Sequence, residues 1–282
     1  MKKAHTPLFA LPLLFAAIPL QASSLYTQNF DALSLGALPT GPNVFTAQIA
    51  PANTSATVID FNGGKALRFV DSSTTGRPVA EHNFVANAES NITTARFDFS
   101  VRLNDFLAAD STVFQIGLGS FNTNTGGYFF STTSARTVDF RLTRGGRLIA
   151  GGQTSASSLD YGDSGVNFSI FANAGSTAVD YTGPDGVVRS LANGKYSVFA
   201  NESLVSLTIS SVPTTQFNFA NANTTGFGRF SFGTGTSNAN ISLDFTVDNI
   251  AVSDFSAIPE PSAFAVLAGF AAFGVVGLRR RR

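Results

Sequence analysis

The chain has 282 residues, with 18 basic side chains, 18 acidic side chains and no cysteine. The missing cysteines exclude a disulfide framework, a thiolate nucleophile and a cysteine-ligated metal. Six of the basic residues but only one of the acidic residues lie in residues 1–24 and 258–282. The body between these ends is therefore mildly acidic, and no basic face for nucleic acid is expected.

The first residues follow the order of a secretory signal peptide. Lys2 and Lys3 precede an apolar stretch over residues 8–20, and small residues follow at 22–24. This order of charged, apolar and small residues directs a chain to the Sec translocon and is removed at export. We expect residues 1–24 to be the signal peptide and residues 25–257 to form one folded domain.

The body alternates apolar and polar residues with period two and shows almost no helical signal. Period two predicts antiparallel strands with one buried face. The clearest case is the strand over residues 96–103, in which every second residue is apolar. Residues 62–65, with the sequence Asn-Gly-Gly-Lys, predict a hairpin turn between strands at 58–61 and 66–70, because glycine tolerates the positive φ that such a turn needs. Roughly a dozen such strands predict an all-β fold, a two-sheet antiparallel β-sandwich of jelly-roll type.

Near the end of the body the alternation changes its phase. The apolar residues of this segment are Leu243, Phe245, Val247, Ile250 and Val252, and the first three have a parity opposite to the last two. The change falls at Asp248 and Asn249. It predicts a β-bulge at these two residues, because one extra residue reverses which side chains face the core.

The chain ends on three consecutive features. Pro259, Glu260 and Pro261 precede an apolar run over residues 262–278, which is followed by four arginines: Arg279, Arg280, Arg281 and Arg282. As a helix the run spans about 26 Å, slightly less than the hydrocarbon core of a bilayer. The arginines hold the end of the chain on the cytoplasmic side. The pattern predicts a C-terminal transmembrane helix.

This ending resembles the PEP-CTERM protein-sorting signal, which we assign to residues 258–282. The resemblance implies recognition of the Pro-Glu-Pro motif by an exosortase and transient anchoring in the inner membrane. It also implies delivery to the cell surface or to an extracellular polysaccharide matrix. An ordinary single-pass anchor is the alternative.

Four segments of the body resemble the concanavalin A-like lectin/glucanase superfamily: residues 29–31, 64–69, 96–101 and 246–252. The resemblance implies the same sandwich fold, and a shared fold does not confer an activity. Glucanases of this superfamily carry acidic residues at alternate positions of one strand. The glutamates of the body, Glu81, Glu89 and Glu202, do not follow that pattern.

Catalytic groups are not indicated elsewhere in the body. Hydrolysis of a sugar bond needs two carboxylates, and the nearest aspartate pairs are Asp160 with Asp163 and Asp244 with Asp248. We expect both pairs to serve turns and strand edges. His82 is the one histidine of the body, has no nucleophile elbow nearby and is expected at the surface.

Calcium is the one ion for which the sequence offers ligands. Asp31, Asp248 and Asn249 would meet if the first and last strands of the body pair, and their oxygens would suit a structural calcium. The other interpretation is that Asp248 and Asn249 fill the bulge.

Glycan binding has two candidate segments. The body has no tryptophan, and residues 126–130 carry aromatic side chains that we expect in the core. A basic stripe of Arg136, Arg141, Arg144 and Arg147 either contacts an acidic polysaccharide or forms a solvated strand face. We therefore expect a non-catalytic, exported surface or extracellular-matrix protein with a structural or adhesive role. A secreted carbohydrate-binding or glycan-hydrolysing jelly-roll protein is the alternative.

Overall fold

The computed structural model describes residues 23–37, 45, 47–49, 52–73, 77–83, 92–104, 112–119, 136–161, 165–221, 226–234 and 243–255. The predicted PEP-CTERM segment, nearly all of the predicted signal peptide, residues 126–130, Glu89 and Asp163 lie outside these ranges. The described ranges contain strands and turns, every strand pairing is antiparallel, and no helix within them is long and apolar enough to cross a bilayer. The predicted all-β, antiparallel architecture is confirmed.

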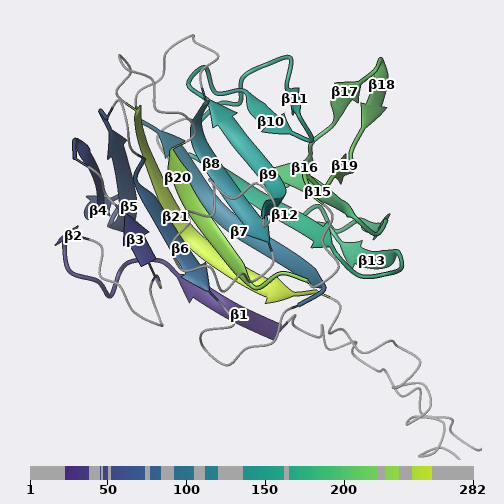
Figure 1. Ribbon diagram of the computed structural model, residues 1–282, viewed down its shortest axis with the longest axis horizontal. Helices are drawn as coiled ribbons and strands as arrows, with labels where there is room; N and C mark the ends of the chain where they lie inside the picture. The colour runs from purple at the N-terminus through teal and green to yellow at the C-terminus, as the bar shows by residue number, and fades with distance from the viewer. Residues whose placement is uncertain are drawn as a thin grey trace, which may run out of the picture. The chain divides into compact units, whose positions relative to one another are not determined.

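The larger sheet has ten strands. Its path runs through β16 (Ser203–Leu204), β15 (Lys195–Ala200), β12 (Val166–Asn173), β7 (Thr94–Leu103), β21 (Leu243–Asp254), β5 (Gly64–Asp71), β4 (Thr54–Phe61) and β2 (Gly36–Ala37). In addition, β1 (Ser23–Gln28) pairs with β21, and β19 (Phe217–Asn218) pairs with β15. The first and last strands thus lie side by side, as Figure 1 shows for the purple β1 and the yellow β21.

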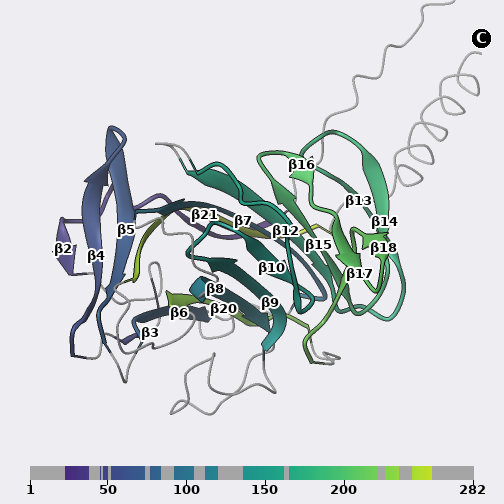
Figure 2. The same ribbon diagram turned by 90° about the horizontal axis from the view of Figure 1, so that it is seen from above.

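The smaller sheet has seven strands and forms the second layer (Figure 2). Its order is β11 (Gln153–Thr154), β10 (Leu148–Ala150), β9 (Arg136–Thr143), β8 (Thr112–Gly119), β20 (Arg229–Thr234), β6 (Val79–Asn83) and β3 (Ala47–Ile49). Two hairpins form separate two-stranded sheets that are not hydrogen-bonded into either layer. They are β13 (Val179–Thr182) with β14 (Val188–Leu191), and β17 (Leu207–Ile209) with β18 (Val212–Thr214).

Phenylalanine side chains fill the space between the two sheets. Phe97 of β7 packs against Phe230 of β20 with ring centroids 5.0 Å apart, and Phe99 packs against Phe232 at 5.8 Å. Each aromatic pair of this kind contributes about 0.5–1.5 kcal/mol beyond the area it buries. The polar residues of β7 alternate with these rings and are partly exposed, as the period-two pattern predicts.

The hairpin and the bulge form where the sequence predicts them. Phe61 pairs with Gly64, and both turn residues between them have positive φ, 48° at Asn62 and 84° at Gly63. Such a two-residue turn matches the twist of its strands. Along β21, Asp248 lies opposite Ser100 and Ala251 opposite Asp98, so one extra residue is inserted. Asn249 takes a φ of 52° within this bulge.

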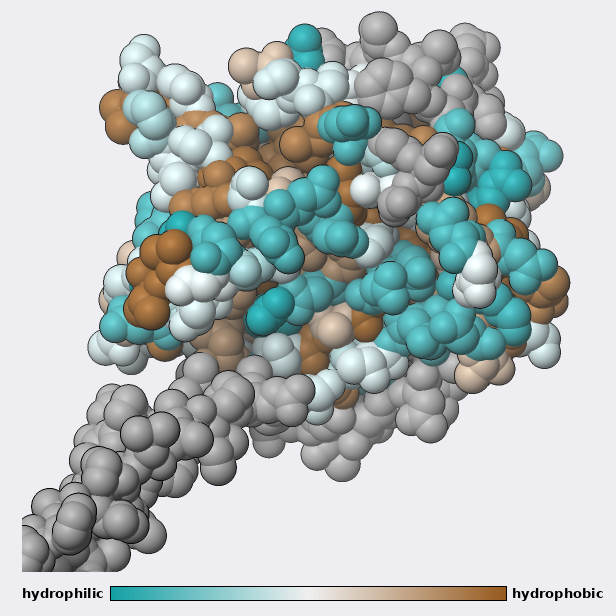
Figure 3. Space-filling view, turned by 180° about the vertical axis from the view of Figure 1, so that it is seen from behind, coloured by the Kyte–Doolittle hydropathy of each residue, from teal (hydrophilic) through white to brown (hydrophobic). Residues whose placement is uncertain are grey.

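A second apolar cluster closes part of the outer face of the ten-stranded sheet. It consists of Phe171, Tyr181, Leu191, Phe199 and Phe255, and it packs beneath the β13–β14 hairpin. The rest of this face carries ion pairs such as Arg68 with Asp244 and Arg96 with Asp98. Hydrophilic residues gather across the middle of the molecule when it is viewed from behind (Figure 3).

Candidate functional site

A row of polar residues lies on the outward face of the seven-stranded sheet. On β8, β9 and β20 the phenylalanines at 114, 140, 230 and 232 face the core. Strand side chains alternate between the two faces. Gln115, Asp139, Arg141, Arg229 and Ser231 therefore belong to the opposite face, and on β6 Glu81 does the same. Of these residues, Asp139, Arg141 and Glu81 are partly exposed, whereas Gln115, Arg229 and Ser231 are buried.

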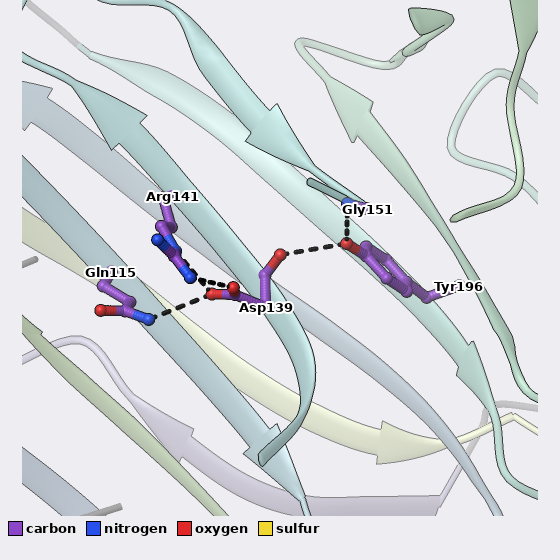
Figure 4. A network of polar contacts seen from close by, with 5 residues as sticks. All are labelled: Gln115, Asp139, Arg141, Gly151 and Tyr196. Carbon is purple, nitrogen blue, oxygen red and sulfur yellow. Dashed lines mark hydrogen bonds and ion pairs between the residues drawn. The ribbon is translucent and has the colours of Figure 1, made fainter. Parts of the chain in front are cut away.

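Asp139 is the centre of the first polar network in this row (Figure 4). Arg141 holds its carboxylate with two donors: Nε donates to Oδ1 at 2.8 Å, and Nη2 donates to Oδ2. Gln115 donates from Nε2 to Oδ1 at 3.0 Å. Gln115 and Arg141 are directly opposite each other on β8 and β9. The hydrogen bond to Asp139 raises the pKa of Arg141, so the pair is charged and mutually neutralised.

Glu81 and Arg229 form a second pair on the same face. Nη1 of Arg229 lies 3.3 Å from Oε1 of Glu81, and the arginine is only 4% exposed. Burial raises the pKa of Glu81, and the charge of Arg229 offsets part of that rise. The interaction neutralises this acidic group as well, so the described part of the face carries paired rather than isolated charges.

Small residues separate the two pairs. The register places Glu81 opposite Ser231, Ser231 opposite Gly117, and Gly117 opposite Asp139. The hydroxyl of Ser231 is buried and has no hydrogen-bond partner among the residues that the structure describes. With three strand spacings between them, Glu81 and Asp139 are attached to backbones about 14 Å apart.

His82 is buried and not at the surface, so this expectation was wrong. It is 1% exposed, and its ring lies 4.1 Å from that of Tyr26 and 5.6 Å from that of Phe230. Glu81 takes the outward position on β6, and the next residue must therefore face the core. The imidazole serves as a packing element of the sandwich.

The basic stripe also differs from both expectations. Arg141 is bound to Asp139, and Arg144 is buried. Arg147 is half-buried, and the side chain of Arg136 lies outside the described part of the structure. Arg141 and Arg144 are therefore neither part of a solvated strand face nor available as free cations for an acidic polysaccharide.

Of the two aspartate pairs, only Asp244 with Asp248 lies wholly within the described residues, and its spacing along the strand does not suit catalysis. Asp160 is exposed in a loop, and its partner at 163 is outside the described residues. Asp244 and Asp248 are four residues apart on β21, which is about 13 Å along a strand. Two catalytic carboxylates lie about 5–9.5 Å apart. Arg68 binds Asp244 through Nε at 2.9 Å, so this residue forms an ion pair between two neighbouring strands.

β1 pairs with β21, which is the pairing that the candidate calcium site of Asp31, Asp248 and Asn249 requires. Burial, and then the charge of Asp31, raise the pKa of Asp248 to about 6. Both carboxylates already accept hydrogen bonds: Asp31 from Lys65 N at 2.8 Å, and Asp248 from Asn249 N at 2.7 Å. The described residues contain no group of three or more acidic or histidine ligands. Two carboxylates and one amide fit calcium only if water completes the shell.

No family model and no curated protein matches the chain. Solved structures do resemble it. A carbohydrate esterase of the Shiga toxin-encoding bacteriophage phi24B is 11% identical, with 83% of this chain and 99% of that chain covered and a TM-score of 0.46. The cellulose-induced protein Cip1 is 10% identical, with 81% and 96% covered and a TM-score of 0.49. The calcium-bound exoplasmic domain of VIP36 is 8% identical, with 82% and 89% covered and a TM-score of 0.45. Likeness at this level assigns neither an activity nor a ligand.

Proposed function

We propose that the chain is an exported, non-catalytic protein of the cell surface or extracellular matrix that holds polysaccharide on its seven-stranded sheet. The observation that supports this role most directly is the network of Gln115, Asp139 and Arg141 on the outward face. Planar amide, carboxylate and guanidinium groups, fixed by one another, are suited to hydrogen-bonding the hydroxyls of a sugar.

The paired charges favour a neutral, hydroxyl-rich polysaccharide. Arg141 and Arg229 each have an acidic partner, so neither of these two arginines of the face offers a free positive charge to a polyanion. Arg141 uses two of its five N–H groups on Asp139, which leaves guanidinium donors on a side chain that is 34% exposed. The hydroxyls of a sugar can accept hydrogen bonds from these remaining donors.

The same pairing supports a non-catalytic role. A general acid or a nucleophile of a glycosidase must act within about 5–9.5 Å of a second carboxylate. Glu81 and Asp139 stand on strands three spacings apart, and each is bound by an arginine. Incubation with polysaccharide is expected to release no reducing sugar, and steady release would contradict the non-catalytic assignment.

Export and sorting are supported by the two ends of the sequence. Pro259, Glu260 and Pro261, the apolar run and the terminal arginines form the sorting signal, and the signal peptide supplies the export route. The intact mass of the chain from the surface fraction tests this directly. We expect the mass to show that both ends have been removed. A surface form that retains Arg282 would contradict the sorting signal and would identify the C-terminal segment as an ordinary membrane anchor.

Binding is tested on the full chain in detergent by isothermal titration with soluble polysaccharides. Dextran and galactomannan serve as neutral probes, and alginate serves as the polyanionic probe. We expect at least one neutral polymer to bind and alginate to bind more weakly. Binding of alginate alone, or of no polymer, would overturn the proposal for this face.

We also propose Asp31, Asp248 and Asn249 as the place of a structural calcium. The support is that β1 pairs with β21 and that the charge of Asp31 acts on the carboxyl group of Asp248. The ammonium group of Lys65 competes with calcium at this place, because it is positively charged and donates to the backbone carbonyl of Asp31 at 3.0 Å.

A further inference from the structure

Tyr196 connects the ten-stranded sheet to the proposed site on the other sheet. It belongs to β15, is fully buried, and packs against Phe217 with ring centroids 5.5 Å apart. Its hydroxyl reaches β9 and β10, where it accepts a hydrogen bond from the Gly151 amide at 2.7 Å. It donates to the backbone carbonyl of Asp139 at 3.0 Å (Figure 4).

The register shows what this hydroxyl replaces. The amide of Thr143 donates to the carbonyl of Arg147, and Arg141 lies opposite Ile149. Hydrogen-bonded pairs recur at every second residue of an antiparallel ladder. The next such pair is therefore Asp139 with Gly151. Here the tyrosine hydroxyl stands between the two backbone groups and satisfies both.

The backbone at position 151 requires glycine in this arrangement. Gly151 and Gly152 have φ values of 55° and 76° and form the two-residue turn between β10 and β11. A Cβ at position 151 would lie 3.2 Å from the Cβ of Phe217, so a side chain there would be crowded as well as strained. The turn therefore brings a bare amide to the tyrosine hydroxyl.

We propose that Tyr196 is a positioning residue of the polysaccharide site, acting through Asp139. The hydroxyl fixes the backbone of Asp139, and the carboxylate of Asp139 in turn holds Arg141 and Gln115. This inference rests on the proposed function. Tyr196 itself is buried and does not touch the ligand.

The test is the Tyr196→Phe variant of the full chain, titrated with the neutral polysaccharide that the parent binds. Tyr161→Phe is the matched control, because Tyr161 is also buried and its hydroxyl has no partner within the described residues. We expect Y196F to weaken binding about tenfold, which corresponds to loss of one buried hydrogen-bonding group. Y161F is expected to bind as the parent does.

A double-mutant cycle separates positioning from general damage to the fold. The double variant combines Asp139→Asn with Tyr196→Phe. If Tyr196 acts through Asp139, this double variant binds the polysaccharide no more weakly than D139N alone. Hydrogen exchange of the Gly151 amide gives an independent measurement and is expected to become faster in Y196F. If Y196F does not fold, 4-fluorophenylalanine at position 196 keeps the size of the ring and removes the hydroxyl proton.

Two outcomes distinguish the inference from its premise. Parent-like affinity of Y196F, with D139N impaired, would overturn the role of Tyr196 and leave the site in place. Parent-like affinity of D139N would overturn the site itself. Additive losses in the double variant would show that Tyr196 acts independently of Asp139, which also contradicts the inference.

Discussion

The hydroxyl of Thr234 donates a 2.6 Å hydrogen bond to the carboxylate of Asp71, and this contact joins the two sheets. Thr234 ends β20 of the seven-stranded sheet, and Asp71 ends β5 of the ten-stranded sheet. Both residues are buried. The other oxygen of Asp71 accepts from the Ser73 amide at 3.0 Å. A buried carboxylate thus has donors for both of its oxygens, one of them from the opposite sheet.

Thr234→Val is therefore expected to destabilise the fold. Valine has the shape of threonine but leaves Oδ2 of Asp71 buried without this donor, at a cost of about 2–3 kcal/mol. The free energy of unfolding in urea measures the loss. Thr182→Val is the control, because Thr182 is exposed on β13. Its effect should stay within about 0.5 kcal/mol, and equal losses in both variants would contradict the role of the contact.

Asp248 is expected to make the stability of the protein depend on pH. Burial and the charge of Asp31 raise its folded-state pKa to about 6, from 3.8. Between these pH values the folded chain holds a proton that the unfolded chain releases, so stability falls as the pH rises through this window. Asp248→Asn should raise Tm at pH 7 and leave it nearly unchanged at pH 4. Asp180→Asn, at an exposed position, is the control for the loss of one negative charge. Equal shifts of Tm in the two variants would contradict the role of Asp248.

Calcium is expected to relieve the same repulsion if it binds at Asp31 and Asp248. Millimolar calcium at pH 7 should then raise Tm of the parent and have little effect on D248N, since binding to the folded state alone stabilises it. Magnesium is the control ion. An identical shift of Tm in the parent and in D248N would show that calcium binds elsewhere. If calcium does not shift Tm of the parent, the calcium proposal is wrong.

The bulge makes a prediction about Asn249. Its φ of 52° lies in the left-handed region, which asparagine and glycine tolerate and β-branched residues do not. Asn249→Val should cost about 1–2 kcal/mol of unfolding free energy, whereas Asn249→Gly should be nearly neutral. Ser253→Val, at an ordinary position of the same strand, is the control. A loss at position 253 as large as that at 249 would argue against backbone strain.

The sequence predicts the local features of this fold well. The alternation of β7, the Asn62–Gly63 turn and the phase change at Asp248 each depend on residues that are close in sequence. The antiparallel sandwich follows from them. The burial of His82 was missed because a short strand with apolar neighbours on both sides does not reveal which parity faces the core.

Most contacts of the candidate site could not be predicted from the sequence. Gln115 and Asp139 meet because β8 and β9 pair in one particular register, and Glu81 meets Arg229 across 148 positions of sequence. Neither contact leaves a local pattern. The sequence presents Arg141 as part of a basic stripe and Glu81 as one of three glutamates, and the local signal for the site is the Asp139–Phe140–Arg141 spacing. It places opposite charges on one face of a strand.

The most direct test of the polysaccharide-binding site compares two variants that each remove one arginine-bound carboxylate. Asp139→Asn alters the proposed site, and Asp185→Asn alters the Arg189–Asp185 pair within the β13–β14 hairpin. Titration of the full chain with a neutral polysaccharide should show D139N weakened about tenfold or more, because Arg141 loses its charged partner. D185N should bind as the parent does. Equal affinities of the two variants would contradict the assignment of this face as the binding site.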